Sequence, residues 1–342
     1  MRPDETAGAP GARKILASAA RAAAVSGLAA LAGCATTPDD VRREAAPGND
    51  DAADRVAPSL YSTDPAVRQA AIQELLKMKN SDEATGALLS ATISPDPDVR
   101  GDAGAAMLFQ PQVDLDLYSI TLVADKDPGV RKKIAEGLAA AGRDGTYETK
   151  LEAGIYLWGL EQDKDPQVRA AAAQGLGELG LEDPMVFALA ALQKDPDPRV
   201  RAAAATGLGT PARLYLAGES GPGWGDAPVD KFLAGQVGGR APTPVQARGA
   251  EIVAALCQAA RLDDGEYVDV IYVDGWFGRD KVEEKHWVAI AAAQALSVPG
   301  QAPRADVAAA QAAAYARVPA VAPVIAPAPE KANMPPMRDA EN

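Results

Sequence analysis

Residues with catalytic potential are sparse in this chain. The sequence contains one histidine, His286, which lies two residues after Glu284. A di-iron carboxylate centre needs histidine and carboxylate ligands on several helices. A single pair is too few, so the sequence excludes such a centre. The chain has no Gly-x-Ser-x-Gly elbow, phosphate-binding glycine loop or zinc-ligand spacing. Two acidic runs lack the spacing of a calcium loop and are typical of turns, Asp195-Pro196-Asp197 and Asp263-Asp264-Gly265-Glu266. We therefore expect no catalytic residue, no metal and no cofactor.

One cysteine has the surroundings for a different reaction, the attachment of lipid. Near the N-terminus, basic residues precede a short apolar run, which is the order found in signal peptides. The run ends in Leu31-Ala32-Gly33-Cys34, which closely resembles the bacterial lipobox. The resemblance implies cleavage before Cys34 and acylation of that residue. Residues 1–33 are then a lipoprotein signal peptide.

Lipid attachment predicts where the protein works. Acyl chains on Cys34 would anchor it to a bacterial membrane, with the body outside the cytoplasm and facing the periplasm. Ala35 after the cysteine favours export to an outer membrane. Residues 34–51 contain Thr-Pro, Asp-Asp and Pro-Gly-Asn-Asp-Asp and show no apolar period, so we expect a flexible tether there. Cys257 lies in an apolar helical run, so we expect a buried thiol; a reactive thiol would need basic neighbours.

Five arginines could form a row that binds anions, because each occurs at the same place in a repeated phrase, Asp-Pro-x-Val-Arg. Successive prolines of the phrase are 32, 31, 38 and 32 residues apart. Aspartate is a good N-cap, proline suits the first helical position, and the valine and following alanines mark a buried stripe. A fixed period of this length is typical of stacked helical repeats. The pairs are Asp64/Arg68, Asp96/Arg100, Asp127/Arg131, Asp165/Arg169 and Asp197/Arg201.

These five phrases resemble the HEAT repeat family, and most closely the short alanine-rich repeats first associated with phycobilin lyases. The resemblance covers residues 52–209 and implies an all-α fold, an α-solenoid of HEAT-like helical hairpins. It also implies that each turn aspartate and the arginine four residues later join a polar ladder along one edge. We favour the ladder over an anion-binding row, because each arginine comes with its own carboxylate. The 38-residue step predicts a longer loop near residues 144–147.

The pattern changes after residue 209. We interpret residues 210–298 as an atypical C-terminal repeat that caps the solenoid. The β-branched and aromatic stretch 266–276 predicts a strand-like insertion, with a small hairpin as one form, in place of an Asp-Pro turn. Residues 299–342 are rich in Pro and Ala and predict a disordered tail after a short helix. The three helices expected here are 245–261, 281–296 and 306–317.

Aromatic residues concentrate in the last third of a chain whose aromatic content is 5%. They have two interpretations: they cover the open end of the solenoid, or they form a binding patch. We favour the cap, because strand-like segments need a surface to pack on. The candidate patch consists of Trp224, Tyr267, Tyr272, Trp276 and Phe277.

The sequence favours a scaffold over an enzyme. A formal charge of −13, with basic residues dispersed among acids, argues against nucleic acid as a partner. Our main hypothesis is a lipid-anchored extracytoplasmic scaffold or adaptor that binds an unidentified protein on a concave face lined by the second helix of each repeat. One alternative is a cell-wall or glycan-binding module that uses the C-terminal aromatics. The second, from the resemblance, is a phycobilin-lyase-like enzyme, which export fits poorly. The oligomeric state stays open.

Overall fold

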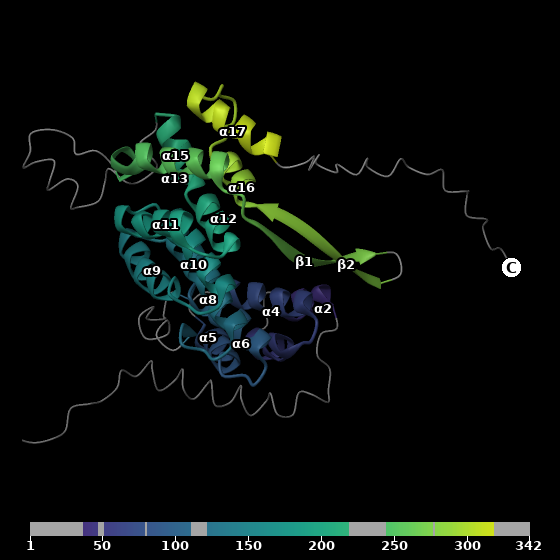
Figure 1. Ribbon diagram of the computed structural model, residues 1–342. Coiled ribbons are helices and arrows are strands. Elements are labelled where there is room, and N and C mark those ends of the chain that lie inside the picture. Colours follow the sequence, from purple (N-terminus) through teal and green to yellow (C-terminus); the bar gives the residue numbers. More distant parts are fainter. Residues whose placement is uncertain are drawn as a thin grey trace, which may run out of the picture.

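The protein is an elongated stack of helical hairpins with one two-stranded sheet projecting from it (Figure 1). The computed structural model describes residues 37–46, 51–78, 81–110, 122–218, 244–275 and 278–317. Within these ranges helices predominate, and the strands form a single antiparallel pair. The predicted all-α solenoid with a strand-like C-terminal insertion is confirmed. No helix in these ranges is long and apolar enough to cross a membrane.

The second helix of each hairpin begins at the proline of the repeated phrase. In all five, the preceding aspartate is the N-cap, and its carboxylate accepts a hydrogen bond from the backbone N–H two residues later, at 2.8–2.9 Å. The predicted roles of aspartate and proline are confirmed. These helices are α4 (Pro65–Lys77), α6 (Pro97–Met107), α8 (Pro128–Asp144), α10 (Pro166–Leu179) and α12 (Pro198–Gly207).

The first helices form a second row beside this one. Each second helix packs on the next, so α6, α8, α10 and α12 follow one another in sequence order. In Figure 1 the first helices α9 and α11 lie on one side of that row, and the hairpin of strands projects from the other. The described first helices are α3 (Ala52–Val56) with the 3₁₀ turn η2 (Ala57–Tyr61), α5 (Asp82–Ala91), α9 (Tyr147–Leu160) and α11 (Glu182–Lys194).

The long 38-residue step does not contain the predicted loop. Helix α8 has 17 residues and α9 has 14, and two residues, Gly145 and Thr146, separate them. The hydroxyl of Thr146 caps α9 by accepting a hydrogen bond from the N–H of Thr149 at 3.3 Å. The extra residues therefore lengthen helices, which buries them better than a loop would.

Small side chains set the spacing of the core. The valine of every phrase is at most 3% exposed, and the residues packed around it are mostly alanine and leucine. Because alanine helices can approach closely, adjacent second helices come into backbone contact. A Cβ added to Gly177 of α10 would lie 2.6 Å from the carbonyl carbon of Gly207 in α12. Gly177 therefore makes this close contact possible, and Gly180, in the left-handed conformation at φ 67°, ends the helix.

A sixth repeat closes the array. Helix α15 (Pro244–Leu262) packs on α11, and α16 (Val288–Ala295) packs on α12, as first and second helices should. Strands β1 (Glu266–Gly275) and β2 (Gly278–Trp287) stand where other repeats have an Asp-Pro turn, which matches our interpretation. The predicted helix over 281–296 is wrong in its first half, because residues 278–287 pair with β1 from Trp287 opposite Glu266 to Gly278 opposite Gly275.

Short helices cover both ends. Helix α2 (Pro38–Glu44) lies inside the predicted tether; Thr37 and Asp40 form a capping box, and Val41 is fully buried beside α4. This order was missed because seven residues with one apolar anchor show no period. Helix α13 (Gly209–Leu216) follows α12 and packs on α15. Helix α17 (Ala305–Arg317), the short helix expected before the tail, covers α15 and α16 with three buried apolar residues.

The contact between α10 and α12 yields a stability prediction. Gly177→Ala should lower the free energy of unfolding by about 1–3 kcal/mol, because the new methyl meets backbone that cannot move aside without separating two helices. Gly159→Ala is the matched control: a Cβ there meets nothing within 4 Å, so helix propensity should raise stability by up to ~1 kcal/mol. Urea denaturation measures both. Equal effects would contradict the close packing.

Candidate functional site

The five phrase arginines fasten each repeat to the next. Their side chains are 5–17% exposed. In each, one terminal nitrogen donates to the backbone carbonyl six residues earlier, at 2.8–3.0 Å, and so closes its own turn. The remaining side-chain donors reach across to a carboxylate of the following repeat. Each arginine therefore belongs to two repeats at once.

The carboxylates that accept these bonds are not the turn aspartates we predicted. Arg131 donates to both oxygens of Asp163 at 2.6 and 2.8 Å, and Arg169 to both oxygens of Asp195 at 2.9 and 3.1 Å. Arg100 pairs with Asp125 in the same way. These aspartates lie two residues before the turn aspartate of the next repeat. The turn aspartates are engaged elsewhere, because their carboxylates cap their own helices.

For the first joint, made by Arg68, and the last, made by Arg201, the residue at that same offset in the next repeat decides the partner. Where the others have aspartate, the second repeat has Ser94, so Arg68 donates instead to Asp102 of α6 at 3.0 Å. In the sixth repeat Asp263 occupies the offset and accepts two bonds from Arg201, at 2.7 and 2.9 Å. The run Asp263-Asp264-Gly265 thus supplies the carboxylate of this joint just before the strands, although we had treated its acids as simple turn residues.

The sequence carried a signal for these partners. Asp125, Asp163 and Asp195 each precede a turn aspartate by two residues, a fixed offset in three of five phrases. Each also accepts the backbone N–H of that turn aspartate, at 2.8–2.9 Å. We missed them because the turn aspartate four residues before each arginine already offered a carboxylate partner within the same phrase.

Electrostatics agrees with a structural role. Burial disfavours ionisation of Asp125 and Asp163, but the hydrogen bonds from the facing arginine and from the backbone outweigh it and lower the pKa of both. Because their pKa is lowered by folding, these groups stabilise the protein above the pKa of the unfolded chain, and the contribution is lost as the pH falls through the folded value. An external anion would have to displace a carboxylate from each arginine.

A second feature is a row of exposed apolar side chains on the first helices. Tyr147, Leu151, Ile155 and Trp158 follow one another along α9 at spacings of four, four and three residues, so they share one face. Ile155 is 63% exposed and Trp158 49%. The row continues onto α11, where the Phe187 ring lies 5.6 Å from that of Trp158. We call this set, completed by the exposed Val186, the apolar stripe.

Sequence reasoning did not find the apolar stripe. On α9 the buried residues are Ala153, Gly154, Leu157 and Leu160. Apolar residues therefore surround much of this helix, and a period alone cannot tell its core face from an exposed one. The packing of α9 on α8 and α10 decides which face is buried and leaves the second face uncovered.

The second helices offer a different surface from the one we expected. Large exposed hydrophobic residues are absent from α4, α6, α8, α10 and α12 within the part of the chain that the structure describes. Ion pairs join neighbours there instead: Lys133 contacts Asp102 at 2.8 Å, and Arg143 contacts Glu178 at 3.1 Å. The row of exposed apolar side chains thus lies on the first helices.

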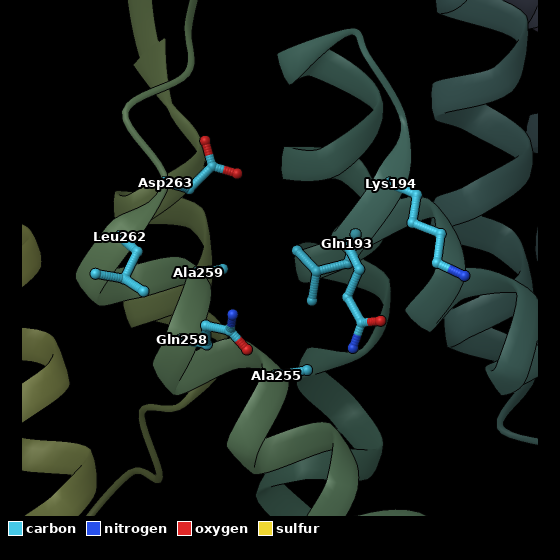
Figure 2. A pocket seen from close by; sticks show the side chains of 8 residues that line it. Gln193, Lys194, Ala255, Gln258, Ala259, Leu262 and Asp263 are labelled. Atoms are coloured by element: carbon cyan, nitrogen blue, oxygen red, sulfur yellow. The ribbon is translucent and has the colours of Figure 1, made fainter.

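A groove of about 460 Å³ opens between α11 and α15 (Figure 2). Figure 2 shows Gln193 and Gln258 on its two facing helices, with Leu262, which is 70% exposed, near its end. Its acid, Asp263, is held by Arg201. The titratable side chains that line the groove are those of Asp263 and Lys194. The remaining lining residues are Leu192, Lys194, Ala255 and Ala259.

Of the predicted aromatic patch, the structure describes the side chain of Tyr267. Trp224, Trp276 and Phe277 lie outside the described residues, as does the side chain of Tyr272 in β1. Tyr267 is half-buried at the base of the hairpin, where its ring stacks on His286 at 5.0 Å with Arg199 5.9 Å away. Its ring thus contacts side chains of the protein itself.

The two residues singled out for special chemistry differ in outcome. Cys34 lies outside the described residues, so its lipidation stays a prediction. Cys257 is 6% exposed, and burial raises the pKa of its thiol, which confirms the buried thiol. No cluster of three or more metal-ligating side chains occurs in the described ranges.

Together these features define the class of the protein, an all-α solenoid of HEAT-like helical hairpins. A family model described as HEAT repeats matches residues 156–214, from the end of α9 to α13. Among solved structures, the chain is similar to the crystal structure of an engineered protein, at 16% identity and a TM-score of 0.34, over 59% of this chain and 97% of that one. No curated protein matches the sequence.

The ladder predicts an unequal response to charge removal. Arg131→Ala should lower the free energy of unfolding by about 3 kcal/mol, because it leaves the buried carboxylate of Asp163 without its partner. The neighbouring Lys132→Ala breaks only an exposed pair with Glu136 and should cost less than ~0.5 kcal/mol. Thermal and urea unfolding measure both. Similar losses of stability for the two variants would contradict the conclusion that Arg131 joins two repeats through Asp163.

The raised pKa of Glu161 predicts that replacing this residue increases the stability of the protein in a pH-dependent way. Burial, and next the charge of Asp195, raise the pKa of Glu161 from 4.5 to about 7. Because its folded pKa is raised, ionisation of Glu161 costs stability as the pH rises through about 7, and there is no cost below 4.5. Glu161→Gln should therefore stabilise by ~1 kcal/mol at about pH 8.5, after allowance for solvent screening, and by much less at about pH 5. The exposed Glu136→Gln is the control. An equal gain at both pH values would refute the assignment.

Proposed function

We propose that this protein is a scaffold or adaptor that binds another protein through the apolar stripe. HEAT repeats generally serve as protein-interaction scaffolds and are typically non-enzymatic, and a family model of such repeats matches part of the chain. The observation that carries the proposal is the exposure of Ile155 and Trp158 in one continuous row with their neighbours.

Exposure of this kind is informative because the residues are contiguous. Single exposed hydrophobic residues are common on soluble proteins, whereas a row of them marks an interaction site. The apolar stripe includes tyrosine, tryptophan and phenylalanine, the residue types enriched in the cores of protein interfaces. An aromatic contact already joins its two helices, since the rings of Trp158 and Phe187 are 5.6 Å apart.

The frame that carries the apolar stripe supports binding without rearrangement. Helices α9 and α11 belong to consecutive repeats, and the Arg131–Asp163 and Arg169–Asp195 pairs join these repeats to their neighbours. A surface held in its bound geometry loses little conformational entropy on association. The exposed side chains on α9 and α11 thus keep fixed positions relative to each other and form one binding surface.

We also propose that Cys34 is lipidated and anchors the protein outside the cytoplasm. The lipobox-like sequence that precedes it supports this proposal. Helix α2 begins at Pro38, four residues after Cys34, and packs on α4. Lipidation would therefore hold the α2 end of the array close to the membrane, with the sixth repeat at the distant end.

Site-specific crosslinking in cells tests both parts of the proposal. A photoreactive residue at position 155 should yield an adduct with a defined protein, and one at Gln167 of α10, exposed on the other row, should not. Cys34→Ser should release the protein from the membrane fraction and abolish its acylation, as read by mass spectrometry. Equal adducts at the two positions would sink the scaffold proposal. Unchanged fractionation and mass would sink the anchor.

A further inference from the structure

The geometry of the apolar stripe specifies the shape of the partner, an inference that rests on the proposed function. Its residues on α9 follow an i, i+4, i+8, i+11 course, which spans about 17 Å along the helix. Ridges at four-residue spacing fit into the grooves of a facing helix. A helix with its own apolar face is therefore the form of chain that covers such a row most fully.

Charge at the borders of the apolar stripe specifies the partner's polarity. Glu148 and Glu152 follow two of its residues along α9, and Glu182 and Asp183 lie in the first turn of α11. Among the described residues, the ion pair recorded for these four acids joins Glu182 to Arg248, at 3.3 Å. The nearest lysine on α9, Lys150, is half-buried, and its burial lowers its pKa.

Helix dipoles account for only part of this arrangement. Acids are favoured in the first turn of a helix, which explains Glu148, Glu182 and Asp183. Glu152 lies in the second turn of α9, where the dipole gives it little stabilisation. With the chain at a formal charge of −13, the acidic border repels anionic surfaces and attracts cationic ones.

The same border argues against two other occupants. A second copy of the chain would bring Glu148 and Glu152 against their own kind, so self-association through α9 places like charges together. An anionic membrane surface carries the same sign of charge as the border. A partner with positive charges beside an apolar face complements both the apolar stripe and its acidic border.

We infer that the apolar stripe binds an amphipathic α-helix of a partner protein, with leucine-like residues along its contact face and lysine or arginine beside them. The apolar side chains supply the free energy of binding, and the basic ones select the orientation and the partner.

A designed peptide tests this inference on the purified full chain. The probe is a fluorescent helix of ~16 residues, with leucines at i, i+4, i+7 and i+11 and lysines beside them; its matched control has glutamates in place of the lysines. Fluorescence anisotropy should give a Kd of about 1–100 µM for the basic peptide and at least tenfold weaker binding for the acidic one.

Variants of the protein separate the two contributions. Ile155→Ser should weaken the basic peptide about tenfold, and Glu148→Lys with Glu152→Lys should weaken it severalfold while improving the acidic peptide. Ile93→Ser, which removes an isoleucine that is 77% exposed beyond α5, should change nothing. Ile155 is 63% exposed, so its replacement should leave the melting temperature unaltered.

Three results would overturn the inference. The first is equal binding of both peptides. The second is a dimer in sedimentation equilibrium that Ile155→Ser dissociates, and the third is flotation with anionic phospholipid vesicles that the same variant abolishes. If position 155 crosslinks in cells but the basic peptide does not bind, this inference fails and the proposed function stands. If position 155 does not crosslink, both fail.

Discussion

In the part of the chain that the structure describes, one arginine with a side chain at most 17% exposed joins each of the first five repeats to the next. The guanidinium closes its own turn through a backbone carbonyl and reaches a carboxylate of the following repeat, as Arg131 does with Asp163. A guanidinium in such a position is costly without its partner, so the two repeats must keep the register that brings the charges together. Hydrophobic burial drives the helices together, but between similar alanine faces it distinguishes poorly among nearby registers. The ionic joint removes that ambiguity.

The same constraint explains how the array tolerates change at its ends. Ser94 cannot accept a guanidinium as a carboxylate can, and Arg68 turns to Asp102 instead. At the other end, a hairpin of strands replaces the Asp-Pro turn, yet Asp263 still receives Arg201. The insertion is accommodated because the joint depends on one carboxylate before the turn, and the chain after it is free to differ.

The two rows of helices present different surfaces. Alanine-rich second helices pack closely and carry ion pairs on their outer side, so that row offers few large apolar side chains for a partner. Helix α9 has a second apolar face, which includes Ile155 and Trp158. No neighbouring helix in the described part of the chain covers this face, which leaves Ile155 63% and Trp158 49% exposed. Its acidic border then restricts which partners can use it.

The sequence by itself determined the parts of this structure that depend on local rules. Capping, the fixed φ of proline and the helical period act within a few residues, so the Asp-Pro helices could be read directly. The acidic partners of the arginines, such as Asp163, were decided by the tertiary structure, because two residues about 30 apart in the chain meet only when repeats stack. The exposure of Ile155 was decided in the same way: it is set by which face of α9 packs on α8 and α10, and an apolar period on both faces of α9 does not encode that choice.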